Sequence, residues 1–410
     1  MSTEPRFHHP LAFWLGCVAV AAGVLLHMPM YLMAAPMHYQ LAGMAMDLPM
    51  TVGMVLIPCG VLLAGYGLMP HLAQLRQSLH GHDLHHHFHV ADGVPLQREH
   101  WTLVIALALA LAIDVMKPAS LAFVMPGVTA EYGIGMGTAG WLALSALTGT
   151  ALGSLLWGRL ADLFGRRSAI LLSAILFMGT AVCGTMPTFG WNLAMCFLMG
   201  AAAGGMLPIA FTLMAETIPA AHRGWLLVAL GGVGTSAGYL AASGAATLLE
   251  PSYSWRSLWL LNLPTGALIL FLNRYIPESP RFLSNAGLHA QARAVLARFT
   301  GGRGAVVVDP AGADSDPPVL ESLHPAADLR QLLRGRHARI TAGLAICGLA
   351  WGLVNFGFLL WLPANLATLG VDARDASALL ARSALLAVPG TAVVVWLYQR
   401  WSSFRSLVLL

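Results

Sequence analysis

Long apolar stretches separated by short polar segments make up most of this sequence. A run of about 20 largely apolar residues is long enough to cross the hydrocarbon core of a bilayer as an α-helix. Prolines and glycines inside several runs do not argue against this, because membrane helices tolerate both. Ten such spans are predicted, over roughly residues 11–35, 48–70, 102–127, 138–158, 168–187, 190–215, 224–249, 256–276, 340–363 and 377–398. The pattern therefore predicts an all-α fold, a polytopic membrane helical bundle that contacts the lipid bilayer.

The composition agrees with a membrane protein and excludes several other classes. Of 410 residues, 57% are hydrophobic and 10% are charged, and a soluble protein of this size could not bury so much apolar surface. The net charge of +4 is not gathered into a basic patch with interleaved aromatic residues, so we expect no nucleic-acid partner. Because no nucleophile–base grouping, nucleotide loop or cofactor motif is present, we expect neither an enzyme nor a cofactor. An oligomeric state is not predicted.

Basic residues in the short connections predict how the spans are oriented, because cytoplasmic loops are enriched in arginine and lysine. Three arginines lie within residues 158–167, and Arg223 lies two connections later. The connections on the other side are poor in basic residues. Residues 128–137 carry Glu131 alone, and Arg256 is an exception at the edge of a span. The basic connections are therefore predicted to be cytoplasmic.

This orientation places both termini and the segments 71–101 and 277–339 inside the cell, in a multi-pass protein of the inner membrane. The longer segment is polar, and a helical pattern covers Ala290–Phe299. A stretch rich in Gly, Asp and Pro follows at 301–318, which is typical of a connecting loop. We interpret 277–339 as a cytoplasmic linker with short surface helices.

Four polar motifs punctuate the middle of the chain. They read GRLADLFGRR at 158–167, GAAAGG at 200–205, AETIP at 215–219 with Arg223-Gly224, and PESPRFL at 277–283. In this order and at these intervals the motifs resemble the N-terminal six-helix half of the major facilitator superfamily, in its sugar-porter-like and organic-solute:proton symporter branch. The resemblance covers about residues 101–283.

The resemblance implies a fold of two six-helix halves and divides the chain into four parts. These are an accessory two-helix membrane segment with a His-rich cytoplasmic loop (1–100), a complete N-terminal half (101–283), a cytoplasmic linker (284–338) and a partial C-terminal half (339–410). Only two spans follow the linker, and Phe404–Leu410 looks like the start of another. We therefore expect a C-terminally truncated chain whose second half is incomplete.

The resemblance also implies a gate at the cytoplasmic face, where opposite charges on neighbouring helix ends can pair. Each exposed pair is worth only about 0–1 kcal/mol, which is sufficient to bias two states of similar energy. The alternative is ordinary positive charge that only sets the topology. The residues expected to form this gate are Gly158, Asp162, Gly165, Arg166, Arg167, Glu216, Arg223, Glu278 and Arg281.

Two charged residues lie deep inside the first span of the core, Asp114 and Lys117. Their spacing of three places them on one helix face, where they can pair. A charge inside the membrane usually marks a transport pathway or a proton site. Three interpretations stay open: Asp114 carries a coupled proton, Lys117 binds an anionic substrate with Asp114 as its resting partner, or the pair only stabilises helix packing.

Two asparagines and one departure from the family complete the candidate site. Asn262 and Asn355 lie in apolar spans, where an amide needs a hydrogen-bond partner from the protein or from a ligand. Members of the family often have an arginine in the fourth core helix, at the position that is Cys196 here. If that arginine normally assists proton release or anion binding, this chain does without it or uses Lys117.

The N-terminal region offers a metal-based alternative. Methionines occur at 28, 30, 33, 37, 44, 46, 50 and 54, and histidines at 71, 80, 82, 85, 86, 87, 89 and 100. Thioethers suit Cu(I), and imidazoles suit Zn, Cu or Ni. The two sets are predicted on opposite sides of the membrane, however, and methionine also fills apolar gaps. The five cysteines form no C-x-x-C pair. We therefore predict an accessory helix pair and assign no metal ligand.

Together these patterns predict a secondary active transporter of a small organic solute, such as a sugar or an organic acid, that works by alternating access. We expect a small-molecule substrate and a coupled proton as partners. The alternatives are a metal-ion transporter (Cu, Zn or Ni) that uses the Met/His-rich N-terminus and a non-transporting membrane sensor on a transporter scaffold.

Overall fold

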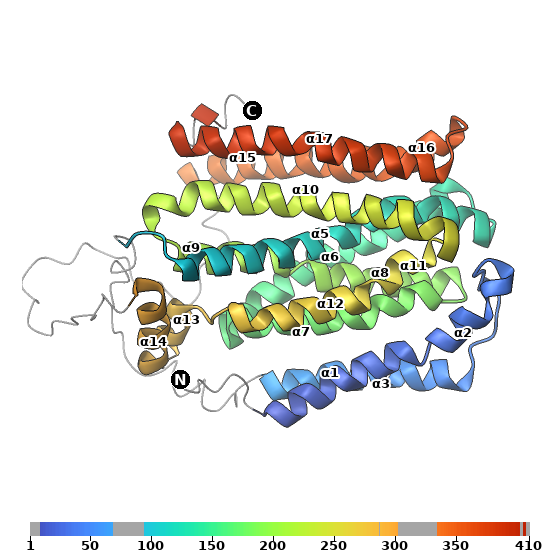
Figure 1. Ribbon diagram of the computed structural model, residues 1–410, viewed down its shortest axis with the longest axis horizontal. Helices are drawn as coiled ribbons and strands as arrows, with labels where there is room; N and C mark the ends of the chain where they lie inside the picture. The colour runs from blue at the N-terminus through green and yellow to red at the C-terminus, as the bar shows by residue number, and fades with distance from the viewer. Residues whose placement is uncertain (1–8, 69–93, 287, 302–333, 402–404, 407–410) are drawn as a thin grey trace, which may run out of the picture.

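The computed structural model describes residues 9–68, 94–286, 288–301, 334–401 and 405–406 of the chain. The regular structure within these ranges is helical, and the long helices run roughly parallel or antiparallel (Figure 1). Nine helical segments are long and apolar enough to cross a membrane in the part described. We call the end of the bundle that carries residues 158–167 the basic end and the other the opposite end.

The accessory pair lies on one side of the bundle, next to α7 (Arg166–Gly179) (Figure 1). It consists of α1 (Pro10–Leu25), α2 (Met28–Met33), the 3₁₀ turn η1 (Ala35–Met37) and α3 (Leu48–Leu68). Helices α1 and α3 touch through glycines, since a Cβ on Gly16 would lie 2.5 Å from the backbone of Ala64. Small residues allow such contact in lipid, where no hydrophobic force draws helices together.

The six-helix half forms the centre of the molecule. Its elements are α5 (Arg98–Tyr132), α6 (Met136–Phe164), α7 with η3 (Thr180–Thr185), α8 (Phe189–Ala203), α9 (Met206–Thr217), α10 (Ala220–Tyr253), α11 (Arg256–Leu260), α12 (Asn262–Leu272) and η4 (Asn273–Tyr275). The fourth core span packs very closely against the second. A Cβ on Gly200 would lie 1.9 Å from the carbonyl oxygen of Ala146 on α6.

One predicted span differs from expectation. Residues 256–276 form α11, α12 and η4 rather than one continuous helix. Pro264 has no N–H to donate to the carbonyl of Leu260, so the helical hydrogen bonding breaks next to Leu261. The backbone at Leu261 keeps right-handed helical angles, φ −59° and ψ −17°, so the segment continues in nearly the same direction.

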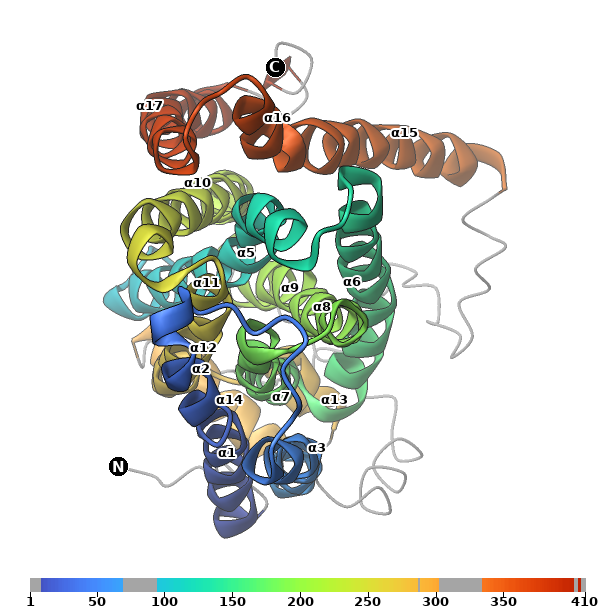
Figure 2. The same cartoon turned by 90° about the vertical axis from the view of Figure 1, so that its right-hand side faces the viewer.

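The remaining helices follow the core. Helices α13 (Pro280–Asn285) and α14 (His289–Thr300) lie at the basic end, and α14 confirms the predicted helix at 290–299. Residues 302–333, which include most of the predicted loop, lie outside the described residues. The chain then forms α15 (Gly335–Gly352), the π-helical turn η6 (Leu353–Phe358), η7 (Leu359–Trp361), α16 (Leu362–Thr368) and α17 (Ala373–Arg400). Figure 2 shows these as a layer on the side away from the accessory pair.

Candidate functional site

The charged pair lies inside the bundle on α5. Nζ of Lys117 is 3.3 Å from Oδ1 of Asp114, and the two side chains are 2% and 7% exposed. The same ammonium group lies 3.0 Å from the centroid of the Phe177 ring on α7, a cation–π contact that is strongest where water is excluded. A buried charge without a partner is costly, and the pairing of the two side chains offsets much of that cost.

A narrow pocket opens beside Lys117, where the six-helix half meets the C-terminal layer. Residues of α5, α6, α8 and the η6–η7 segment line it: Lys117, Pro118, Leu121, Ala146, Leu147, Thr150, Met199, Gly200, Ala203, Phe356 and Leu360. Among these lining residues Lys117 is the one charged side chain. The pocket therefore presents a single positive charge in a mostly apolar wall.

Asn262 lies behind the wall of this pocket. It is buried at the start of α12, with Nδ2 3.9 Å from Sδ of Met199, which lines the pocket. Cys196, one turn before Gly200 on α8, is fully buried. At the position where family members often carry arginine, α8 thus contributes a thiol and no cation.

Asn355 lies elsewhere, on the π-helical turn η6. Its Oδ1 accepts a hydrogen bond of 3.2 Å from the hydroxyl of Tyr239 on α10, and its Nδ2 donates to the carbonyl of Trp351 at 2.9 Å. The next residue, Phe356, lines the pocket beside Lys117. Asn355 therefore connects α10 to the C-terminal layer next to the pocket, without contacting the charged pair.

At the basic end, Glu278 closes the turn between α6 and α7. Its Oε1 accepts hydrogen bonds from the backbone N–H groups of Arg166 at 2.7 Å, Ser279 at 2.9 Å and Arg167 at 3.3 Å. The N-terminus of α7 favours a negative charge at this point. A Cβ on Gly165 would lie 2.3 Å from Oε2 of Glu278, and its φ of +101° favours glycine. Two of the sequence motifs thus form one structural unit.

The guanidinium group of Arg166 joins α6 to α9. Its NH2 lies 3.1 Å from Oδ1 of Asp162 and 3.4 Å from Oε1 of Glu216, and its NH1 donates to the carbonyl of Ala161 at 3.0 Å. The hydroxyl of Ser279 donates to the other carboxylate oxygen of Glu216. Segments from three of the motifs are thereby linked across neighbouring helix ends.

The other predicted gate residues are placed around this cluster. Nε of Arg167 donates to Oδ1 of Asn273 at 2.6 Å. Arg223 donates to the carbonyl of Ile218, the residue after α9, at 3.3 and 3.2 Å. Arg281 is exposed on α13, and a Cβ on Gly158 would meet open space. The structure therefore gathers the middle of the predicted set and leaves Arg281 and Gly158 at its margin.

Desolvation in its largely buried position raises the pKa of the Glu278 carboxyl above its ordinary value of 4.5. The backbone N–H donors of Ser279, Arg167 and Arg166 and the charge of Arg167 lower this pKa, but they do not cancel the rise. The carboxyl that closes the turn therefore takes up a proton at a higher pH than an ordinary glutamate does.

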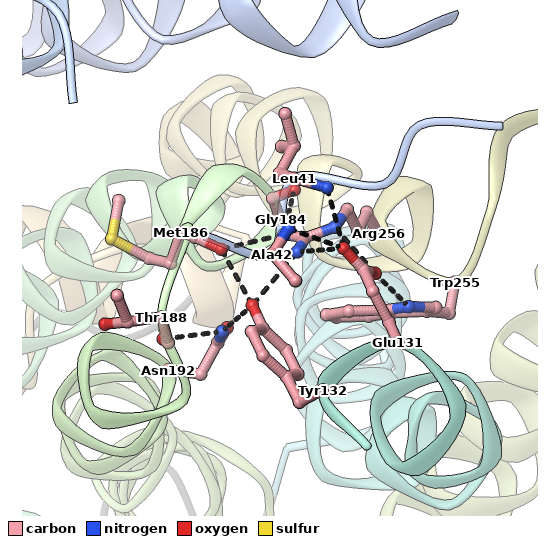
Figure 3. Close-up of polar contacts among 10 residues, drawn as sticks. All are labelled: Leu41, Ala42, Glu131, Tyr132, Gly184, Met186, Thr188, Asn192, Trp255 and Arg256. Atoms are coloured by element: carbon pink, nitrogen blue, oxygen red, sulfur yellow. Dashed lines mark hydrogen bonds and ion pairs between the residues drawn. The ribbon is translucent and has the colours of Figure 1, made fainter. Parts of the chain in front are cut away.

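A second buried ion pair lies at the opposite end, between Glu131 at the end of α5 and Arg256 at the start of α11 (Figure 3). Arg256 NH2 is 2.7 Å from Glu131 Oε1, and the side chains are 0% and 4% exposed. In the sequence, the only signal for this pair is one acid and one base at an end that otherwise has few charges. The partners come from distant segments, so the pattern did not reveal the pairing.

Metal ligation finds no support in the residues described. Within them, no three His, Cys, Asp or Glu side chains lie close enough together to hold a metal ion. Met30 and Met50 are 2% and 0% exposed and belong to an apolar core. Histidines 71, 80, 82, 85, 86, 87 and 89 lie outside the described residues, whereas His100 packs against Phe299 with ring centroids 5.0 Å apart.

Comparisons with known proteins agree with this architecture. The sequence model of the family described as Major Facilitator Superfamily matches residues 103–410. The niacin transporter NiaP of Acinetobacter baylyi is 27% identical over 310 residues, which cover 75% of this chain and 69% of that protein. The 4-hydroxybenzoate transporter PcaK of the same organism is 31% identical over 211 residues, which cover 51% of this chain and 46% of that protein.

Among solved structures, the xylose transporter XylE from E. coli in a partially occluded inward open conformation has a similar fold. The TM-score is 0.56 at 16% sequence identity, and the match covers 74% of both chains. A structure of a double Trp variant of XylE matches with a TM-score of 0.53 at 18% identity, covering 72% of this chain and 68% of that one.

Proposed function

This chain belongs to the major facilitator superfamily, and on that premise we propose that it is a proton-coupled secondary transporter of a small organic solute in the inner membrane of a bacterium. Members of the family move solutes by rocking one half against the other around a central site. The observation that carries the proposal is the buried Asp114–Lys117 pair beside a pocket between the two parts of the bundle.

The chemistry of the pocket favours an anionic solute. Lys117 is the one charged residue in a mostly apolar wall, a lining that matches a small molecule with an apolar body and one carboxylate. In this conformation the pocket has room for about one water molecule, so we propose that the bundle opens here to admit the solute. Niacin and 4-hydroxybenzoate, the compounds in the names of two relatives, are both aromatic carboxylic acids. We therefore propose aromatic monocarboxylates as the first solutes to test, ahead of sugars.

Asp114 is proposed as the proton carrier and Lys117 as the group that binds the solute. When Asp114 is ionised, its carboxylate forms an ion pair with the ammonium group of Lys117 at 3.3 Å. A proton on Asp114 removes that charge and leaves Lys117 with only the Phe177 ring, so that a carboxylate of the solute can take the place of Asp114. Release of the solute and of the proton restores the pair, which couples the two fluxes. In this scheme Lys117 also supplies the cation that α8 lacks at Cys196.

The cluster at the basic end is proposed to be the cytoplasmic gate of the N-terminal half. Its support is the set of contacts among Asp162, Arg166, Glu216 and Glu278, which tie α6, α7 and α9 to the segment 277–283 at the end of the N-terminal half. We propose that the basic end faces the cytoplasm. We also propose the four-part division of the chain, with boundaries after residues 100, 283 and 338. Arg167, Arg223 and Arg281 are proposed as supporting residues, and Asn262 and Asn355 as positions beside the solute route.

The test is uptake of labelled nicotinate and 4-hydroxybenzoate, with a labelled sugar for comparison, into proteoliposomes that carry the full chain. We expect uptake of at least one carboxylate to rise when an inward proton gradient is imposed, and we expect Lys117→Gln to abolish it. Lys117→Arg keeps the charge and serves as the matched control. Gradient-driven uptake that persists in Lys117→Gln, or a preference for the sugar, would show that the substrate proposal is wrong.

A further inference from the structure

The carboxylate of Glu131 receives five hydrogen bonds at the opposite end of the bundle, and two come from the accessory pair. The backbone N–H groups of Leu41 and Ala42 donate to Oε1 at 2.7 and 3.0 Å, and Nε1 of Trp255 donates to Oε2 at 3.0 Å. Arg256 contributes the other two, from Nε at 3.1 Å and NH2 at 2.7 Å. One buried carboxylate therefore joins the loop between α2 and α3 to the core (Figure 3).

The guanidinium group of Arg256 completes this site. Besides the two bonds to Glu131, NH2 donates to the hydroxyl of Tyr132 at 2.9 Å, and NH1 donates to the carbonyls of Met186 at 2.9 Å and Gly184 at 3.3 Å. Five contacts match the five N–H groups that an arginine offers. Because every donor has a partner, the pair can stay buried without the cost of an unsatisfied charge.

The accessory loop, residues 38–47 between η1 and α3, and helix α2 make further contacts with the same end of the core. The N–H of Gly43 donates to the carbonyl of Pro187 at 3.0 Å, and the hydroxyl of Tyr31 donates to the carbonyl of Tyr253 at 2.6 Å. Between these points, His38 and Tyr39 have φ angles of +53° and +59°. Residues other than glycine seldom adopt such backbone angles unless the surrounding structure enforces them. The loop is therefore held in a defined shape against the core.

We propose that the Glu131–Arg256 pair, with the accessory loop bound to it, is a permanent clasp that makes the accessory pair part of the N-terminal half. The contacts of the clasp described above all lie between residues 31 and 256. Four of them, from Tyr31, Leu41, Ala42 and Gly43, cross from the accessory segment to the six-helix half, and the rest lie within that half. None of these contacts involves α15–α17. The pair α1–α3 therefore moves with the N-terminal half as one body, rather than opening and closing over the solute route. This inference does not depend on which solute or ion is carried.

Cysteine crosslinking tests the clasp directly. Ala42→Cys and Thr188→Cys, in a background without the five native cysteines, flank the hydrogen bond between Gly43 and Pro187. Both positions are exposed. We expect a short flexible bis-maleimide to link them with the same yield with and without solute or an imposed proton gradient. We also expect the crosslinked protein to retain the uptake rate of the uncrosslinked double variant.

Two results would overturn the proposal. A yield that changes with solute or gradient, or a crosslink that stops uptake, would show that the loop is a moving lid. Should the chain prove not to transport, the yield still reports whether the loop is docked, so the clasp and the transport proposal fail separately.

Removal of the charge on Glu131 gives an independent test in the same double-cysteine protein. Glu131→Gln leaves Arg256 without its counter-ion, so we expect crosslinking to slow several-fold. The variant protein should stay monodisperse on size-exclusion chromatography. Glu250 lies on α10 at the same end of the bundle. Glu250→Gln is therefore the matched control and should leave the crosslinking rate unchanged. An unchanged rate in Glu131→Gln would contradict the clasp. If that variant is not recovered folded, the crosslinking result in the parent protein decides.

Discussion

At the scale of single residues, the ammonium group of Lys117 has two partners of different kinds, the carboxylate of Asp114 and the face of the Phe177 ring. Removal of one partner of a buried ion pair leaves a charge with neither water nor counter-ion, whereas removal of both leaves no charge at all. Substitutions at the two positions should therefore not be additive.

This gives a stability prediction. We expect Lys117→Gln to lower the stability of the protein by about 3–5 kcal/mol, since it leaves Asp114 buried and unpaired. We expect the double variant Asp114→Asn, Lys117→Gln to unfold close to the temperature of the parent. Thermal unfolding in detergent measures both. A double variant whose loss equals the sum of the single losses would contradict a coupled pair.

A pH prediction belongs to Glu278. Its folded-state pKa lies above the ordinary 4.5 because of desolvation, so the folded protein binds this proton more tightly than the unfolded chain does. The stabilising contribution is therefore present below the unfolded pKa and is lost as pH rises through the folded pKa. We expect Glu278→Gln, which mimics the protonated form, to flatten the stability profile in that window. Thermal unfolding of the parent and of Glu278→Gln at a series of pH values is the measurement.

Single residues also show where sequence reasoning was sufficient. Asp114 and Lys117 stood out because charge inside an apolar span is rare, and their spacing of three predicted the contact that the structure shows. Glu131 and Arg256 are 125 positions apart, and their hydrogen-bond partners come from the accessory loop, α5, residues 184–186 and the turn before α11. No local pattern encodes such a meeting point, so only the folded structure reveals it.

At the scale of elements, glycines determine how closely α6 and α8 approach. A Cβ on Gly200 would lie 1.9 Å from a backbone oxygen of α6, whereas Gly190 on the same helix has nothing within 4 Å. We expect Gly200→Ala to destabilise the protein by about 1–3 kcal/mol through overpacking and Gly190→Ala to be neutral or slightly stabilising. Thermal unfolding of the two variants is the measurement. Equal changes in unfolding temperature would mean that α6 and α8 can move apart to accommodate the added methyl group.

The turn between α6 and α7 allows a second comparison of this kind. An alanine at position 165 would have to adopt a φ of +101°, and its Cβ would clash with the carboxylate of Glu278. An alanine at position 158 would place its Cβ in open space. We expect Gly165→Ala to lower the unfolding temperature, since a backbone with φ +101° and ψ 153° costs residues other than glycine about 1–3 kcal/mol, and Gly158→Ala to leave it unchanged. If Gly158→Ala proved the more damaging, the role given to this turn would be wrong.

The elements themselves were largely predictable, because about 20 apolar residues are a strong signal for a helix in lipid. The predicted span at 256–276 is broken at Leu261 next to Pro264. The π-helical turn at Leu353–Phe358 had no counterpart in the prediction. Both features depend on which backbone hydrogen bonds form, and a hydropathy pattern does not report this.

At the scale of the whole molecule, the structure consists of an accessory pair, a central six-helix half and a C-terminal layer (Figure 2). The proposed site for solute and proton lies where the second and third of these meet, and the proposed clasp joins the first and second. In this account the clasp keeps one body together, while the pocket beside Lys117 lies at the boundary where two bodies rock.

The central claim is that a proton on Asp114 controls access of the solute to Lys117, and transport by Asp114→Asn tests it most directly. Solute exchange across proteoliposomes needs no net proton movement, whereas accumulation against a gradient does. We predict that Asp114→Asn retains exchange and loses proton-driven accumulation, because the neutral amide leaves Lys117 available in both states. Accumulation at the level of the parent protein would contradict the account.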